Sequence, residues 1–81
     1  MRSGCVILWD IPNPNVDGFH LTLFEVDEGE GTYDIVQQTS IQSPARAFHL
    51  ANLKKGKTYQ IDLRVKIGEN YGSPVTVRKR F

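Results

Sequence analysis

The chain has 81 residues, of which 40% are hydrophobic, and its ten basic and nine acidic residues give a formal net charge of +1. This length predicts a single domain over residues 1–81, with enough apolar side chains for one core. The charge balance lacks the basic excess of a nucleic-acid binder and the polybasic cluster of a membrane-surface binder, so we expect neither kind of partner.

The single cysteine, Cys5, cannot form an internal disulfide. No asparagine is followed two residues later by serine or threonine, so an N-glycosylation site is absent from the sequence. Both observations lean towards an intracellular or nuclear setting, although a disulfide-free domain is compatible with secretion as well. The first apolar run, residues 5–9, is too short for a secretion signal or for insertion into a membrane.

Alternation of apolar and polar residues predicts short β-strands along the whole chain. In the first candidate, Cys5, Ile7 and Trp9 share one face, and the clearest candidate alternates four apolar residues, starting at Tyr59, with four polar ones. Such strands have one buried and one solvated face, as in antiparallel sheets. In chain order, the candidate strands are residues 5–10, 19–24, 33–38, 47–50, 59–66 and 75–80.

The segments between these strands are rich in glycine, proline, asparagine and aspartate, which favour turns. No segment keeps a helical period for ten residues. Short strands separated by about 8–12 residues indicate an all-β sandwich or a small barrel. The predicted turns and loops are residues 11–18, 27–31, 43–44, 54–57 and 68–74.

Three segments, in this order and spacing, resemble a fibronectin type III domain. The sequence Trp9-Asp10-Ile11-Pro12 resembles the strand-B tryptophan of that family and its exit, and residues 18–23 are similar to strand C. Residues 48–65 resemble the passage from strand E to strand F, in which Leu53 stands six residues before Tyr59 of the "tyrosine corner". Residues 72–75 look like the start of strand G, so the resemblance covers about residues 5–80.

The resemblance implies an immunoglobulin-like β-sandwich of two antiparallel sheets. Trp9, Leu53 and Tyr59 would then be structural residues, with the ring of Tyr59 buried and its hydroxyl bonded to the preceding turn. Only four residues precede the first candidate strand, so strand A is expected to be short or missing. The family usually has proline where Lys55 stands. An immunoglobulin domain proper would need a second cysteine.

Catalytic, metal-binding and cofactor-binding residues are not expected. The two histidines, His20 and His49, fall on outward positions of strands that belong to different sheets, so they would not meet over one metal ion or substrate. Cys5 is in phase with Ile7 and Trp9 and reads as a small packed hydrophobe, without the neighbouring base that a nucleophile requires. We therefore expect no enzyme activity and no small-molecule substrate.

Charged residues are expected to gather at one pole of the sandwich, where the acidic loop, the turn at 54–57 and the basic segment 78–80 come together. One interpretation is mutual neutralisation on a solvated surface, and the other is a bipolar patch that orients a neighbouring domain. The spacing does not fit a calcium loop. The residues concerned are Glu25, Asp27, Glu28, Glu30 and Asp34, and Lys54, Lys55, Lys57, Arg78, Lys79 and Arg80.

Two surfaces are candidates for binding another protein. At the opposite pole lie the loop at 11–17 and the loop at 68–74, whose Tyr71, Asn70 and Glu69 would form an exposed anchor. Without strand A, the first strand would have an open edge carrying Val6 and Leu8, which invites a strand from a partner or from a second copy of the chain.

Taken together, these features predict a non-catalytic protein–protein interaction module, such as a scaffold part within a larger multidomain protein. The alternative is a structural spacer that holds neighbouring domains at a fixed geometry and binds nothing itself. The resemblance concerns the fold, and one fold serves many functions, so it does not by itself choose between the two.

Overall fold

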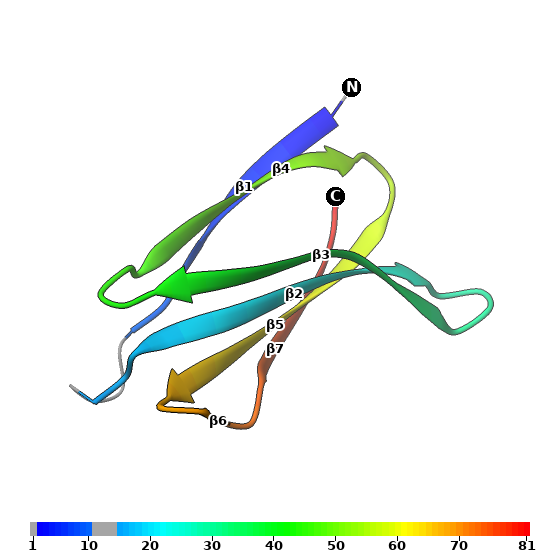
Figure 1. The fold of residues 1–81 in the computed structure, drawn as a ribbon. Coiled ribbons are helices and arrows are strands. Elements are labelled where there is room, and N and C mark those ends of the chain that lie inside the picture. Colours follow the sequence, from blue (N-terminus) through cyan, green and yellow to red (C-terminus); the bar gives the residue numbers. More distant parts are fainter. Residues whose placement is uncertain (1, 11–14) are drawn as a thin grey trace.

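In the computed structural model, which describes residues 2–10 and 15–81, the chain forms seven strands and no helix within those residues (Figure 1). No part of it is therefore a helix that could cross a membrane, as far as the described residues extend. The strands are β1 (Arg2–Leu8), β2 (Gly18–Asp27), β3 (Thr32–Gln42), β4 (Ala47–Lys54), β5 (Thr58–Ile67), β6 (Asn70–Tyr71) and β7 (Val75–Arg80).

The strands are divided between two layers of unequal width. One layer contains only β1 and β4, and the other has the order β3-β2-β5-β6, with β7 also paired to β5. Every pairing is antiparallel. In Figure 1, the β1–β4 layer lies above the wider layer. The arrangement confirms the predicted all-β sandwich of two antiparallel sheets.

The core lies between the layers and comes from inward side chains on β2, β4 and β5. Period-two alternation sends one set of side chains inward from β2 and β5, whereas on β4 the buried Leu50 and Leu53 are three residues apart, with Asn52 at a φ of 62° between them. Cys5, Ile7 and Phe48 pack against this core from the narrow layer. The buried cluster consists of Leu21, Leu23, Leu50, Leu53, Tyr59 and Ile61.

Several strand boundaries differ from the sequence-based expectation. The strand β1 begins at Arg2 and ends before Trp9, because its ladder with β4 runs from Arg2 opposite Lys54 to Leu8 opposite Ala47. The strand β3 is eleven residues long, where the alternation indicated only 33–38. The two-residue strand β6 was not expected. The loop predicted at 11–17 falls partly on residues 11–14, which lie outside the described residues.

The inward side chains of β3 are only partly covered by the narrow layer. On β3, the inward positions opposite Leu21 and Leu23 hold Thr39 and Gln37, whose side chains hydrogen-bond each other at 3.0 Å. Both side chains are half-buried, and their mutual hydrogen bond satisfies polar groups in that place. Thr39, Ser40 and Gln42 interrupt the apolar alternation after residue 38, which explains why β3 looked shorter in the sequence.

Candidate recognition surfaces

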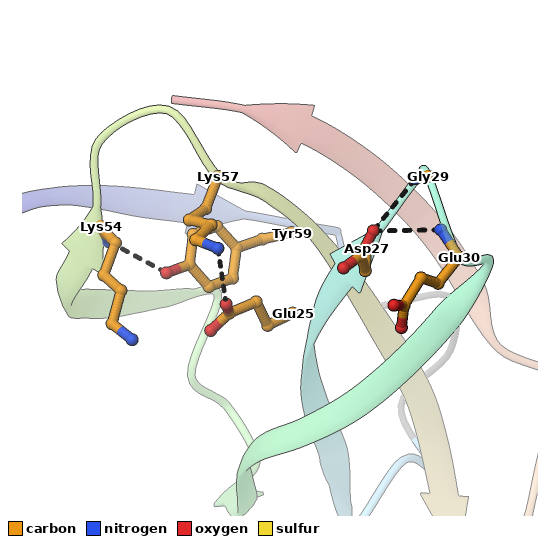
Figure 2. Close-up of polar contacts among 7 residues, drawn as sticks. All are labelled: Glu25, Asp27, Gly29, Glu30, Lys54, Lys57 and Tyr59. Carbon is orange, nitrogen blue, oxygen red and sulfur yellow. Dashed lines mark hydrogen bonds and ion pairs between the residues drawn. The ribbon is translucent and has the colours of Figure 1, made fainter.

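Tyr59 closes one end of the sandwich. Its side chain is buried between the layers, and its hydroxyl accepts a hydrogen bond of 2.9 Å from the backbone N–H of Lys54 (Figure 2). The ring also meets Phe81 edge-on at 5.8 Å. This geometry is the tyrosine corner that the sequence resemblance implied, and it ties β5 to the end of β4 in the other sheet.

The charged groups meet at this same end. The side chain of Lys57 lies 3.6 Å from that of Glu25 (Figure 2). The backbone carbonyl of Lys57 accepts a hydrogen bond from the N–H of Phe81, which brings the end of β7 to the turn before β5. The Lys57–Glu25 pair is partly exposed, so solvent screens it and it contributes little to stability. The shared pole expected from the sequence is therefore present.

The acidic loop at this pole, residues 27–31, is a turn held by hydrogen bonds between its own side chains and backbone. One carboxylate oxygen of Asp27 accepts hydrogen bonds from the backbone N–H groups of Gly29 at 3.0 Å and Glu30 at 3.1 Å (Figure 2). The side chain of Glu28 accepts another from the hydroxyl of Thr58. These carboxylates hold the loop together. Among the residues that the structure describes, no three His, Cys, Asp or Glu side chains converge as a metal site would require.

Tyr71 lies on the outer face of the wide sheet, which differs from its expected place at a loop tip. The short strand β6 pairs with the end of β5, with Tyr71 opposite Lys66. The Tyr71 ring meets the ring of His20 edge-on at 5.9 Å, and Arg64 donates a hydrogen bond of 3.0 Å to the carbonyl of Gly72. Tyr71, His20 and Arg64 together line a shallow hollow, called here the Tyr71 surface.

The neighbouring predicted residues, Asn70 and Glu69, are exposed at the start of β6. Asn70 pairs with Ile67 across a tight turn, and Gly68 in this turn has a φ of 62°, a conformation that glycine adopts readily. His20 and Arg64 were not expected to belong to this surface. The alternation of β2 and β5 could have predicted that His20 and Arg64 lie on neighbouring outward positions. It could not have predicted that β6 folds back to pair with the end of β5.

A second surface lies between β1 and β7. Among the described residues, β1 pairs only with β4, so its other edge is unpaired, and Val6 and Leu8 on it are 59% and 75% exposed. Beside this edge lies an apolar groove between the two layers. Its walls are formed by Ile7, Leu8 and Trp9 on one side and by Ile61, Leu63, Val75 and Val77 on the other.

Trp9 lines this groove and does not belong to the buried core cluster. Its ring meets the ring of Phe19 edge-on at 5.3 Å, and its backbone N–H donates to the carbonyl of Arg46 at 3.0 Å. The indole Nε1 is buried and has no hydrogen-bond partner in the described part of the chain. A buried donor without an acceptor is uncommon in folded proteins.

The nucleophilic and basic side chains do not face one another: His49 lies opposite Val6, next to Cys5 on the paired strand, but it is exposed whereas Cys5 packs against the core. His20 is on β2 and His49 on β4, so the two histidines belong to different sheets. Cys5 is half-buried on β1 and packs against the core. It faces the apolar interior rather than an acid–base partner.

We expect the Cys5 thiol to react slowly in the folded protein, because packing against the core limits access to it. The measurement is the rate of modification by Ellman's reagent in buffer and in denaturing urea. The rate should rise at least tenfold on unfolding. A folded-state rate equal to that of a free thiol would show instead that Cys5 is exposed and activated.

Comparison with protein families gives one match: the fibronectin type III domain model covers residues 1–78. No curated protein matched the chain. The matched range includes β1 to β6 and the first part of β7, together with Tyr59, the Tyr71 surface and the walls of the groove.

Proposed function

Because the chain belongs to the fibronectin type III family, whose domains are generally protein-interaction or structural modules and typically non-catalytic, we propose that it binds another protein through the Tyr71 surface. We further propose that it does so as one part of a larger multidomain protein. The observation that carries the proposal is that Tyr71 is half-exposed and at the same time held in place.

Three contacts hold Tyr71 before any partner arrives. Its backbone pairs with β5, its ring rests against His20, and the adjacent carbonyl of Gly72 is held by Arg64. A side chain that is already ordered loses little conformational entropy on binding. Its large ring then contributes contact area at low cost.

The residue types also fit a binding surface. Tyrosine and arginine are enriched among the residues that contribute most to protein–protein affinity. The guanidinium of Arg64 has five donors and gives one to Gly72 in the structure, so others can reach carbonyl or carboxylate oxygens on a partner. A partner that presents an apolar side chain flanked by such acceptors would fit this surface.

Replacement of Tyr71 by alanine should weaken partner binding at least tenfold while the domain stays folded. The matched control is Val36→Ala, because Val36 on β3 is exposed to the same fraction, 52%, as Tyr71. Immobilised wild-type and variant domains would be compared by quantitative mass spectrometry of the proteins that they retain from the source cells. A partner should be retained by wild type and by Val36→Ala and be lost with Tyr71→Ala.

Two results would contradict the proposal. Equal retention of the partner by Tyr71→Ala would place the binding surface elsewhere. Absence of any protein that wild type retains above a blank support would favour the structural spacer. The variant Tyr71→Phe, which keeps the ring and its contact with His20, should bind like wild type if the ring is the anchor.

A further inference from the structure

Positive charge gathers on the outer face of the wide sheet, the face that points away from β1 and β4. Since Tyr59, Ile61 and Leu63 face the core, the alternate residues of β5 face outward, and the pairing of β7 with β5 puts its outward side chains on the same face. The residues paired with these positions on β2 and β3 include no carboxylate. The charged residues at the outward positions of β5 and β7 are Arg64, Lys66, Arg78 and Arg80, with one carboxylate, Asp62.

The two arginines nearest to Asp62 have only neutral partners. Neither Arg64 nor Arg78 forms an ion pair in the part of the chain that the structure describes. Arg64 donates a hydrogen bond to the backbone carbonyl of Gly72, and Arg78 donates to the side chains of Gln60 and Tyr33. Both positive charges are therefore available to an anionic group on another molecule.

Asp62 lies between these arginines and changes the sign of the charge in the middle of the face. One of its oxygens accepts hydrogen bonds from the hydroxyl of Thr76 at 3.0 Å and from the amide of Gln60 at 3.2 Å. Along β5 the face is positive at Arg64, negative at Asp62, and positive again where Arg78 lies opposite Gln60. These three levels are successive outward positions, which are about 6.6 Å apart on a strand.

An extended polypeptide has the same repeat as this charge pattern, because its side chains on one side are also about 6.6 Å apart. A segment that lies along β5 can therefore present a carboxylate to Arg64, a hydrogen-bond donor to Asp62 and a second carboxylate to Arg78. The backbone of a nucleic acid has a negative charge at every phosphate, so Asp62 would repel the phosphate at the middle level. The pattern favours a protein partner.

Each of the two arginines has an exposed tyrosine beside it. Arg64 lines the Tyr71 surface with Tyr71, and the guanidinium of Arg78 lies over the ring of Tyr33, 5.3 Å from its centroid. Tyr33 is 46% exposed and also meets the ring of Phe24 edge-on at 6.3 Å. Tyrosine and arginine are the residue types that often dominate protein–protein affinity. The outer face thus has an ordered pair of this kind at each end.

We propose that the outer face of the wide sheet is the docking site for an extended acidic segment of a partner protein, in which two carboxylates flank a hydrogen-bond donor at alternate positions. The carboxylates pair with Arg64 and Arg78, and the donor pairs with Asp62. A guanidinium can hold a carboxylate with two parallel hydrogen bonds, which adds geometric specificity. The proposal rests on the proposed function, because the Tyr71 surface is one end of this face, and it adds the class of partner.

The test uses a short synthetic peptide with blocked termini, in which glutamate, lysine and glutamate stand at alternate positions between serines. The peptide is titrated into the isotope-labelled wild-type chain at low ionic strength, and the backbone amide signals are followed by nuclear magnetic resonance. Saturable shifts are expected at Asp62, Arg64 and Arg78, and they should weaken as salt is added. Absence of saturable shifts there, or shifts confined to the lysine-rich turn at 54–57, would overturn the proposal.

Two control ligands test the order and the chemistry of the charges. The first is a peptide of the same composition, in which the lysine is exchanged with one of the glutamates, so that the net charge is unchanged. It should bind at least threefold more weakly, and equal binding would contradict the role of Asp62. The second is a short single-stranded DNA. Tighter binding of the DNA than of the peptide at the same salt concentration would identify nucleic acid as the occupant and overturn the proposal.

Protein variants locate the contact. Arg78→Gln should weaken binding of the alternating peptide at least threefold, because it removes one of the two cations that meet a carboxylate. Lys55→Gln is the matched control, since it removes the same charge from an exposed residue of the turn before β5 and should leave binding unchanged. Should Arg78→Gln fail to fold, Arg64→Gln tests the other cation. Equal binding by the folded arginine variant would overturn the assignment.

Retention of a partner from the source cells separates this proposal from the preceding one, because Arg78 lies outside the Tyr71 surface. A partner that is lost with Tyr71→Ala and kept by Arg78→Gln would leave the proposed function standing and overturn the acidic-segment assignment. The converse result would support the assignment and contradict the role of Tyr71. A dimer of the chain alone in light scattering that Arg78→Gln abolishes would identify a second copy as the occupant and overturn the proposal.

Discussion

Replacement of Leu50 by alanine is expected to lower the free energy of unfolding by about 2–5 kcal/mol, the usual range for a buried leucine. Leu50 is fully buried on β4, where it packs with Leu21 and Leu23 from the other sheet. The two layers share no strand pairing, so side-chain contacts of this kind carry most of their association. The cavity left by alanine cannot be filled without moving one layer against the other.

The measurement is urea denaturation of wild type and Leu50→Ala, followed by Trp9 fluorescence and by circular dichroism. Val36→Ala serves as the control, because Val36 is 52% exposed and its truncation should change the stability by less than about 0.5 kcal/mol. In a domain of this size, the larger loss approaches the whole stability. Equal effects of the two changes would mean that the β1–β4 layer is not packed as described.

Replacement of Tyr59 by phenylalanine should lower the free energy of unfolding by about 1–3 kcal/mol. The ring fits the same space, so the change removes only the hydroxyl that accepts from the backbone N–H of Lys54. That N–H then loses its acceptor in a partly buried place. The expected loss comes from the unpaired group, because apolar burial is unchanged.

Tyr33→Phe is the matched control for this prediction. Tyr33 is 46% exposed, and its hydroxyl accepts a hydrogen bond from Arg78 at the surface. Water can replace that bond, so the change should cost less than about 0.5 kcal/mol. Thermal unfolding of both variants by calorimetry gives the comparison. A Tyr59→Phe variant as stable as Tyr33→Phe would show that the corner hydroxyl is dispensable.

Much of the fold could be predicted from the alternation of apolar and polar residues. The prediction failed for strands whose residues do not alternate or that are too short to show a period. The strand β5 was clear because its four inward side chains are all apolar and its outward ones are all polar. The strand β3 was underestimated because its second half has the polar residues Thr39, Ser40 and Gln42 and only one apolar residue, Ile41. The strand β6 has only two residues, too few to show any period.

The candidate surfaces were predictable only in part. Val6 and Leu8 could be assigned to an open edge from their place in the first strand. The exposure of Val75 and Val77 could not be predicted, because a strand with inward valines has the same sequence pattern whether or not another layer covers it. Tyr71 was expected at a loop tip because the sequence does not state which way a turn at Gly68 folds.

The ladder of β1 bears on the alternative role of a spacer. Arg2 starts β1 opposite Lys54, and the backbone of Phe81 is bonded to Gly56 and Lys57 in both directions, so the first and last described residues leave the sandwich on either side of one turn (Figure 1). Polypeptide attached to Arg2 and to Phe81 would therefore leave the domain from the same end of the sandwich. Such a domain would project sideways from its neighbours instead of separating them along a line.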